Sequence, residues 1–555
     1  MLSRIGRWLL VVAFAAASAT IGFVAWPYLR WLWLQSQILD SGGPLGAAQA
    51  AYDVRRYELA LRVDPARREL RGRSTATLAT LAPLAEVHLD LDRRMAVAAV
   101  AVDGRPARFT HRRGRLVVAL AEPWPAGERH AVTVDYAGHP KVSAHPPWID
   151  GFVWKHAGGG KPWVAVVAQI DGADIFWPVK DHPSDEPEEG VAIALTVPPG
   201  LVGLSNGRRV AERELADGWV ESRWEVSYPI NNYLLTVAVG PYVPVVERYR
   251  GASGELDLAM TFWALPEHFV AARRMWRGAP EILAFFARRF GEFPFPDDKI
   301  AMVESPYVGM EHQTLIAYGD DFLPERFGID ETLVHELAHE WWGNKISARD
   351  WDDFWIQEGF ASYAEALWVE ELRGAEAARD YLEAKRVDIA HRRPLVAGRA
   401  RTAAEAYDDD IYVKGAWVLA SLRWAIGDAP FLRVLRRFAD DPPGVPRLVD
   451  SSELERLVAA ECACELGAFW ERYLRRAEPP RFRLARRGAG SEDVVTFAWD
   501  DPALGLALPV RVGEELVRIE VPAAGATLRV PAGTRVEVET AGRLLAEPAA
   551  ARRDS

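Results

Sequence analysis

Apolar and polar residues alternate along the chain from about residue 52, which is the pattern of strands that bury one face. Residues 57–64 alternate in this way, and similar short runs follow at close intervals. These runs occupy 74–81, 86–91, 97–103, 115–120, 131–136, 191–197, 219–226 and 233–239. Turns such as Asp103-Gly104 separate them without intervening helices, so we expect an all-β, sandwich-like domain over residues 51–243.

A helical periodicity replaces this alternation after residue 244. Residues 268–290 place apolar side chains at helical spacing, and strand-like runs follow at 299–304 and 312–318. Later helices are expected at 331–344, 353–372, 375–391, 412–426, 429–438, 452–464 and 467–475. The break at Glu478-Pro479-Pro480 ends this block, which we expect to be a mainly helical domain over 244–478.

Short alternating runs return after these prolines. They are expected to be strands at 494–499, 506–512, 517–521, 527–530 and 536–539. We therefore expect residues 479–555 to form a small C-terminal β domain and a tail.

An apolar stretch lies near the start of the chain. Residues 8–29 contain 22 residues without a charge and are flanked by arginines, which is long enough to span a bilayer. A cleaved signal peptide is the alternative, with a small-residue site at Ala15-Ala16-Ala17 or Ala17-Ser18-Ala19. We expect residues 1–36 to be a membrane anchor or signal segment and residues 37–50, which are small and turn-forming, to be a linker. Either reading places the bulk of the chain outside the cytoplasm, anchored or secreted.

Composition narrows the class of protein. A chain of 555 residues should divide into about three or four domains, and its net charge of -12 argues against nucleic acid as a partner. Cys462 and Cys464 are the two cysteines, and on a continuous helix their side chains would point apart. We therefore expect two free thiols.

The strongest chemical signal lies in the expected helix 331–344. His335 and His339 are four residues apart, so a helix projects both from one face. Glu336 stands beside them, where a metal-bound water needs a general base, and Asp330 suits the N-cap. A zinc hydrolase is one reading of this motif, and a helix with two incidental histidines is the other.

Glu358 supplies a candidate third ligand. A catalytic zinc usually takes three protein ligands and leaves one position open. Glu358 follows His339 after 18 residues, which allows a turn and the start of a second helix packed on the first. Two imidazoles and a carboxylate are one of the known catalytic sets, so we expect one Zn²⁺ held by His335, His339 and Glu358. The alternative is that Glu358 is one more solvated helix acid.

The motif and its spacing together resemble the gluzincin metallopeptidases of the aminopeptidase N and leukotriene hydrolase family. The resemblance covers about residues 52–480 and implies a thermolysin-like catalytic domain. It includes Val308-Gly309-Met310-Glu311-His312, which is similar to the family's Gly-x-Met-Glu-Asn segment. By this match Glu311 would pair with the free α-ammonium of a substrate, with Gly309 and Met310 beside it. The departures at Val308 and His312 affect the shape of the amine pocket and not its charge.

Three further residues are candidates for the site, two through the same resemblance and one through its position on the helix of Glu358. Tyr412, followed by Lys414-Gly415, resembles the family's catalytic tyrosine, whose hydroxyl donates to the oxyanion; packing alone is the alternative. Gln169 resembles a residue that binds the substrate's N-terminal residue, or it is an ordinary hydrogen-bonded side chain. Glu365, seven residues after Glu358, either orients a ligand histidine or is a plain helix acid.

We therefore expect a multidomain α+β protein with an N-terminal membrane helix, a sandwich-like β domain, a thermolysin-like domain and a small C-terminal β domain. The expected function is a zinc-dependent aminopeptidase with Glu336 as base and Tyr412 as oxyanion donor. A zinc endopeptidase or epoxide hydrolase of the same fold, and a catalytically inactive peptide-binding protein, are the alternatives. Expected partners are peptides with a free N-terminus and a membrane, with the catalytic domains periplasmic or extracellular. No oligomeric state is predicted.

Overall fold

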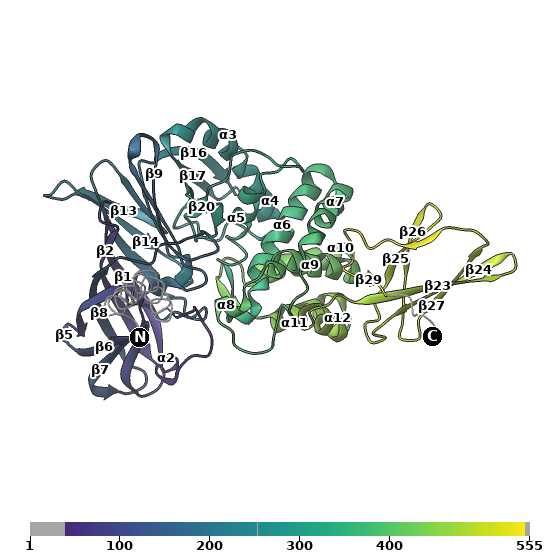
Figure 1. The fold of residues 1–555 in the computed structure, drawn as a ribbon, viewed down its shortest axis with the longest axis horizontal. Coiled ribbons are helices and arrows are strands. Elements are labelled where there is room, and N and C mark those ends of the chain that lie inside the picture. Colours follow the sequence, from purple (N-terminus) through teal and green to yellow (C-terminus); the bar gives the residue numbers. More distant parts are fainter. Residues whose placement is uncertain (1–38, 252–253, 550–555) are drawn as a thin grey trace, which may run out of the picture.

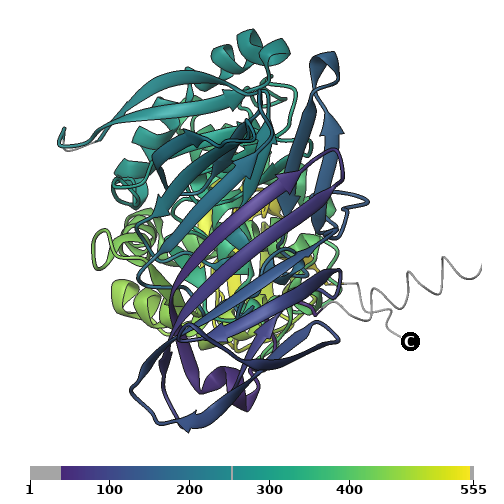
Figure 2. The ribbon, with the colours of Figure 1, turned by 90° about the vertical axis from the view of Figure 1, so that its left-hand side faces the viewer.

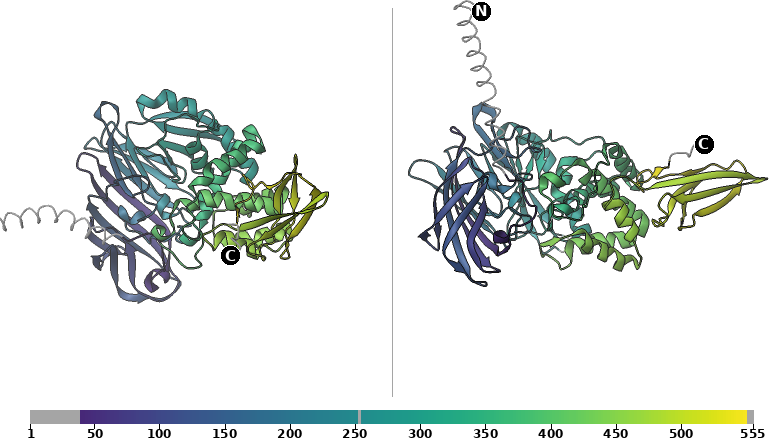
Figure 3. Two further views of the ribbon diagram at one scale, coloured as in Figure 1. Left: turned by 45° about the vertical axis from the view of Figure 1, so that its right-hand side comes forward. Right: turned by 60° about the horizontal axis from the view of Figure 1, so that its bottom comes forward.

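The computed structural model describes residues 39–251 and 254–549, which form three regions in chain order (Figure 1). A β region comes first, helices follow, and a last group of strands projects from the far side of the helices (Figures 1 and 3). The chain is therefore α+β, with a β-rich N-terminal region and a helical region after it, as the sequence predicts. The expected span 8–29 lies outside the described residues, and within them no helix is long and apolar enough to cross a membrane.

An eight-stranded sheet makes up most of the N-terminal β region, and Figure 2 shows it face on. Its strands are β1 (Tyr52–Asp64), β2 (Glu69–Thr80), β4 (Met95–Val102), β5 (Arg105–Pro106), β8 (Arg129–Gly138), β11 (Val191–Val197), β13 (Arg208–Glu214) and β14 (Val220–Val226). The order is β13-β14-β11-β1-β2-β8-β4-β5, antiparallel except for the pair β1 and β11. Leu59, Leu61 and Val63 of β1 are buried and alternate with more exposed residues, which confirms the predicted period of two.

Two smaller sheets and four short helical turns complete this region. One sheet contains β3 (Leu84–Asp90), β7 (Arg115–Trp124) and β6 (Arg108–Arg112), and the other contains β12 (Val202–Ser205), β15 (Val237–Gly240), β10 (Pro162–Val167) and β9 (Gly151–His156). The turns are α2 (Ala47–Ala50), η1 (Gly158–Gly160), η2 (Ala173–Ile175) and η3 (Asn232–Leu234). Gln169 follows the end of β10 by two residues, so this second sheet positions it.

A mixed five-stranded sheet leads into the helical region. Its order is β16 (Val243–Arg250), β17 (Asp257–Ala264), β18 (Ile300–Glu304), β20 (Ile316–Tyr318) and β19 (Gly309–Met310). β19 is the edge strand and runs antiparallel to β20. Glu311 comes directly after β19, so the short edge strand fixes the position of its backbone.

Helices form the middle of the molecule (Figure 1). The α-helices are α3 (Phe269–Trp276), α4 (Ala279–Phe290), α5 (Glu331–Ala338), α6 (Trp355–Arg373), α7 (Ala375–Lys385), α8 (Ala403–Ala406), α9 (Val413–Ile426), α10 (Asp428–Asp440), α11 (Ser451–Cys462) and α12 (Gly467–Leu474). The 3₁₀ turns are η4 (Pro266–His268), η5 (Trp351–Asp353), η6 (Arg386–Asp388) and η7 (Asp409–Ile411), and β21 (Ile346–Ala348) pairs with β22 (Arg447–Val449). The expected helix 268–290 is divided into α3 and α4, with Pro280 in the first turn of α4.

The expected helix 331–344 starts as predicted but is shorter. The Asp330 side chain caps it by accepting a backbone N–H of the first turn at 2.9 Å. Regular helix ends at Ala338, since the next N–H groups, of Glu340 and Trp341, reach carbonyls only three residues back. After the turn at Gly343 (φ 114°), successive N–H groups reach carbonyls five residues back. His339 caps this end with a right-handed helical backbone, so the spacing of the two histidines is unaffected.

Two small sheets form the C-terminal β region. One is β27 (Ala526–Pro531), β24 (Glu492–Trp499), β23 (Arg481–Ala489) and β29 (Glu547–Pro548), and the other is β26 (Glu515–Ile519), β25 (Leu508–Val512) and β28 (Val536–Val538). The region is hydrogen-bonded to α9: Trp424 Nε1 donates to the Ala507 carbonyl at 2.8 Å, and Leu545 N donates to Ser421 Oγ at 2.9 Å.

The expectation of two free thiols is wrong. Cys462 and Cys464 form a disulfide, with Cα atoms 5.2 Å apart. The expectation assumed a continuous helix, but α11 ends at Cys462 and Ala463 has a left-handed backbone (φ 52°, ψ 42°). This turn brings the second sulfur back to the first.

Facing glycines let α6 and α9 pack closely. A Cβ on Gly415 would lie 2.8 Å from the Cα of Gly359, and one on Gly359 would lie 2.9 Å from the Cα of Gly415. Neither position has room for a side chain. Glu358 precedes one of these glycines and Tyr412 is the N-cap of α9, so the contact holds both candidate functional residues on adjoining helices.

Gly415→Ala should therefore destabilise the protein, because the added methyl group pushes α6 and α9 apart. We expect a loss of about 1–3 kcal/mol, seen as a shift of the urea unfolding transition followed by circular dichroism. Gly467→Ala is the matched control, since a Cβ there meets open space at the start of α12. Equal stability of Gly415→Ala and the unmodified protein would show that the helices have room to spare.

Candidate active site

The three expected ligands converge although they come from two helices. Nε2 of His335 and Nε2 of His339 are 3.0 Å apart. Oε2 of Glu358 on α6 lies 3.5 Å from the first of these atoms and 3.4 Å from the second. The turn between the helices thus folds Glu358 back onto the histidine face of α5.

This donor set fits a zinc ion. Two nitrogens and an oxygen at about 2.0–2.1 Å from one tetrahedral ion lie about 3.3 Å from one another, close to the separations here. Oε2 of Glu358 is buried and has no hydrogen-bond partner among the described residues, as expected of an atom reserved for a metal. Glu311, Glu336 and His339 form a second close group, but two carboxylates with one imidazole suit zinc less well.

Hydrogen bonds to the far side of each imidazole orient both histidines. Nδ1 of His335 donates to Oε1 of Glu365 at 2.6 Å, and Nδ1 of His339 donates to the Trp342 carbonyl at 2.7 Å. Both Nε2 atoms therefore face the centre of the site with free lone pairs. Glu365 is not a plain helix acid, because it makes the contact that would orient a ligand.

A cation on α7 holds Glu365 in turn. Lys385 Nζ contacts its Oε2 at 2.8 Å, and the Tyr381 hydroxyl donates to the same oxygen. Although burial opposes it, the nearby carboxylates of Glu358 and Glu365 raise the pKa of His335 well above its usual value. The surroundings therefore favour positive charge at this point.

Glu336 points into the same space. Its Oε2 is buried without a hydrogen-bond partner in the described structure, and burial raises the pKa of its carboxyl to about 8. A Cβ on Gly309 would lie 2.1 Å from Oε1 of Glu336. The glycine of the edge strand is therefore needed for this carboxylate to fit.

Glu311 is held in place by residues from the β region. Its Oε1 accepts from Gln169 Nε2 at 2.9 Å and from the Tyr233 hydroxyl at 2.8 Å, while Gln357 Nε2 donates to that hydroxyl at 2.7 Å. Gln169 Nε2 also approaches Oε1 of Glu358 at 3.3 Å. Burial first, and then the charge of Glu358, raise the pKa of Glu311. Tyr233 and Gln357 carried no signal in the sequence that marks them as part of the site.

Tyr412 lies beside the donor set. Its ring stacks on His335 with centroids 6.0 Å apart, and its hydroxyl contacts the hydroxyl of Tyr407 at 3.3 Å. Tyr407 is a second residue that the sequence did not reveal, because no motif links it to Tyr412. The phenol is thus placed to reach a group bound at the site.

The two departures from the family segment have different consequences. Val308 is 44% exposed and lines the cavity, so it changes the lining without entering the donor set. His312 is buried, and neither ring nitrogen has a hydrogen-bond partner within the described chain. Burial lowers the pKa of His312 to about 3, so it is neutral at ordinary pH.

The site residues expected from the sequence face one cavity of about 480 Å³. It includes every expected site residue: Gln169, Gly309, Met310, Glu311, His335, Glu336, His339, Glu358 and Tyr412. Asp388 and Asp409 lie on its wall, and so does Trp148, whose side chain is 49% exposed. Its size suits a short peptide segment.

Comparison with known proteins identifies the architecture. The family described as "Peptidase family M1 domain" matches residues 276–446, which contain the three ligand candidates. A crystal structure of an M1 zinc metallopeptidase from Deinococcus radiodurans superposes with a TM-score of 0.64 and 25% identity, covering 80% of this chain and 98% of that one. Residues 276–446 of this chain form a peptidase M1 domain. It is of the aminopeptidase N-like gluzincin type, as its motifs predict.

Three curated relatives of this chain are aminopeptidases. The chain is 29% identical to aminopeptidase N of Haemonchus contortus over 48% of this chain and 29% of that protein. It is 26% identical to aminopeptidase B of Rattus norvegicus over 72% of this chain and 66% of that protein. The match spans about a third of the length of mouse endoplasmic reticulum aminopeptidase 1, at 34%.

Removing the carboxylate behind His335 should weaken metal binding by the protein. Glu365→Gln loses the charged acceptor of the Nδ1 hydrogen bond, and we expect zinc affinity to fall about 10–100-fold. Competition with a zinc chelator measures this without any activity assay. Glu371→Gln, an exposed acid on the same helix, is the control and should bind zinc normally. Unchanged affinity in Glu365→Gln would mean that His335 needs no such support.

Proposed function

We propose that the protein is a zinc-dependent aminopeptidase that removes N-terminal residues from peptides. The position of Glu311 carries this proposal. It ends an edge strand, it is buried, and it offers an oxygen within 4.8 Å of ligand atoms of Glu336 and His339. A fixed carboxylate so close to the donor set binds an α-ammonium one residue from the bond to be cleaved. The amine is therefore what sets the cleavage position.

The other residues then have definite roles. A zinc ion held by His335, His339 and Glu358 would supply an activated water and a Lewis acid. Glu336 takes a proton from that water at its unpaired Oε2 and passes it to the leaving amine. The Tyr412 hydroxyl donates to the oxygen that develops negative charge.

The alternatives have less support in the site. An inactive peptide-binding protein would have lost a ligand, the base or the tyrosine, and the described chain contains all of them in one cavity. An endopeptidase would need no carboxylate fixed by Gln169 and Tyr233 at this distance. Nothing in the described cavity singles out an epoxide.

We also place the catalytic region outside the cytoplasm. The disulfide between Cys462 and Cys464 fits an oxidising compartment, and the names of some relatives include the endoplasmic reticulum. Anchoring through residues 8–29 is part of this proposal. The boundaries 1–36, 37–50, 51–243, 244–478 and 479–555 stay predictions.

Glu336→Ala tests the catalytic part. The variant should keep one zinc per chain, because Glu336 is not a ligand, while kcat on an aminoacyl fluorogenic substrate falls by at least about 10³-fold for loss of the base. Metal content and kcat are measured on the same preparation. Near-normal turnover by this variant would overturn the role given to Glu336.

Blocking the amine tests the exopeptidase part. Acetylation of a peptide's N-terminus removes the charge that Glu311 binds, so cleavage should be abolished while the free peptide is shortened from its N-terminus. Mass spectrometry of the products distinguishes the cases. Internal cleavage of the acetylated peptide would indicate an endopeptidase of the same zinc class.

The lining of the cavity further suggests a preference for cationic substrates. It contains five acidic side chains and, among the described residues, no lysine or arginine. Asp388 and Asp409 are exposed there and have no side-chain partner in the described chain. A lysine or arginine side chain could lay its apolar stem against Trp148 and bring its charge to these acids.

Asp388→Asn combined with Asp409→Asn should therefore narrow this preference. Two partly exposed charge contacts of about 0.5 kcal/mol each correspond to about a fivefold fall in kcat/KM for an arginyl relative to a leucyl substrate. Asp380→Asn, an exposed acid of α7 outside the cavity, is the control. An unchanged ratio of kcat/KM for the arginyl and leucyl substrates would show that the two acids do not bind the substrate side chain.

A further inference from the structure

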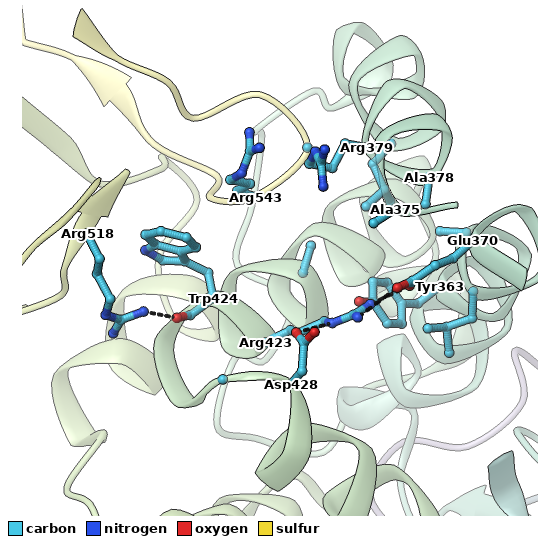
Figure 4. Close-up of a pocket in the computed structure, with 16 residues that line it drawn as sticks. Tyr363, Glu370, Ala375, Ala378, Arg379, Arg423, Trp424, Asp428, Arg518 and Arg543 are labelled. Carbon is cyan, nitrogen blue, oxygen red and sulfur yellow. Dashed lines mark hydrogen bonds and ion pairs between the residues drawn. The ribbon is translucent and has the colours of Figure 1, made fainter. Parts of the chain in front are cut away.

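A second pocket lies between the helices and the C-terminal β region (Figure 4). It is separate from the 480 Å³ cavity around His335, His339 and Glu358, the zinc cavity. It has a volume of about 310 Å³. Its walls come from α6, α7, α9, β26 and the segment after β28, and it shares no lining residue with the 480 Å³ cavity. A cavity of this size holds a small molecule or the end of a peptide.

Two arginines meet on one side of this pocket. Arg379 of α7 and Arg543 of the C-terminal segment are neighbours in Figure 4, and a Cβ on Gly542 would lie 2.4 Å from Cβ of Arg379. The side chain of Arg379 has no ion pair or hydrogen bond among the residues described. Arg543 donates from Nη1 to Glu539 at 3.0 Å, and its Nη2 and Nε make no hydrogen bond in the described chain. Burial, followed by the charge of Arg379, lowers the pKa of Arg543. Glu539 balances the charge of Arg543, so Arg379 is the member of the pair without a counter-charge.

The remaining charges of the pocket are already balanced. Arg423 donates to Glu370 at 2.6 and 2.9 Å and to Asp428 at 2.8 Å, as the dashed lines of Figure 4 show. Arg518 pairs with Glu520 at 2.9 Å and donates to the Trp424 carbonyl. One positive charge, that of Arg379, therefore lacks an acid. The carboxylates of Glu370 and Asp428 across the pocket would repel a dianion such as a phosphate.

An apolar surface adjoins the arginines. Ala378 and Leu382 of α7, Ala366 and Leu367 of α6, and Ala420 of α9 line the pocket and are buried. Their small side chains leave space where larger ones would fill the gap between the helices and the strands. A ligand that fits must therefore combine one negative charge with a small apolar group.

We propose that this pocket binds a carboxylate that carries a small apolar group, with Arg379 and Arg543 holding the carboxylate and the alanine and leucine side chains holding the apolar group. The two guanidinium groups come from separate regions of the chain, so the ligand also bridges α7 and the C-terminal segment. A free amino acid and the C-terminal end of a peptide share this chemistry. The site is independent of the proposed peptidase activity.

Calorimetric titration of the full-length, zinc-loaded protein with N-acetyl-leucine tests the proposal. Its amine is blocked, so the Glu311 site has no ammonium to bind. We expect one saturable site per chain, and at least about tenfold weaker binding of the neutral N-acetyl-leucinamide, because a hydrogen bond to a charged group is lost. Absence of binding by the acid, or equal binding of acid and amide, overturns the proposal.

Variants assign the binding to this pocket. Arg379→Gln should weaken N-acetyl-leucine binding at least about tenfold, and Arg379→Lys, which keeps the charge, should retain more affinity. Arg392→Gln removes an exposed arginine outside the pocket and should change nothing. Arg379 has no partner to lose, so its variants should unfold at the same urea concentration as the unmodified protein. Binding that survives Arg379→Gln but disappears with a zinc chelator lies in the zinc cavity and contradicts the proposal.

Free leucine and N-acetyl-alanyl-leucine separate the two sources of the carboxylate. Stronger binding of the dipeptide points to peptide C-termini, and stronger binding of leucine points to free amino acids. In either case the preferred ligand must also bind more weakly to Arg379→Gln than to the unmodified protein.

Discussion

The site depends on a group of buried carboxylates whose mutual repulsion must be offset by bound cations or by protons. Glu311, Glu336, Glu358 and Glu365 are all at least nine-tenths buried around two histidines. Negative charges that lie this close together and away from water repel one another, and each has lost its hydration. Lys385 balances Glu365 from one side, and the oxygen of Glu358 that faces the histidines has no partner in the described chain. A zinc ion between the histidines would offset the remaining negative charge, so we expect metal binding to stabilise the folded chain.

Missing side chains shape this site as much as the charged ones do. Gly309 leaves the space that the Glu336 carboxylate occupies, and Gly359 against Gly415 brings the helices of Glu358 and Tyr412 together. Each glycine gives up helix or strand propensity for a close backbone approach. The positions of Glu336, Glu358 and Tyr412 follow from these two contacts, so a methyl group added to any of the three glycines would shift these side chains.

The sequence predicts the parts of the site that depend on local spacing. His335, Glu336 and His339 follow from a helical repeat, Asp330 from capping chemistry, and Glu358 from the ligand count of zinc. Tyr233, Gln357 and Tyr407 could not be found in this way, because they act through contacts between segments far apart in the chain. The prediction of two free thiols was wrong for a related reason. A single left-handed residue, Ala463, redirects the backbone, and no periodicity reports it.

The two cavities are built on the same pair of helices, which limits how one can affect the other. The residues from Trp355 to Val369 of α6 are all buried. The helix turns Glu358 to the zinc cavity and Glu365 to the far side of His335, while Tyr363 and Glu370 line the second pocket. The glycine contact fixes this helix against α9, so the pair has little freedom to slide. A carboxylate held by Arg379 and Arg543 would join α7 to the C-terminal segment instead of spreading α6 from α9. Its main effect would therefore be to fasten the C-terminal strands to the helices, leaving the geometry of the zinc donors as the glycines set it.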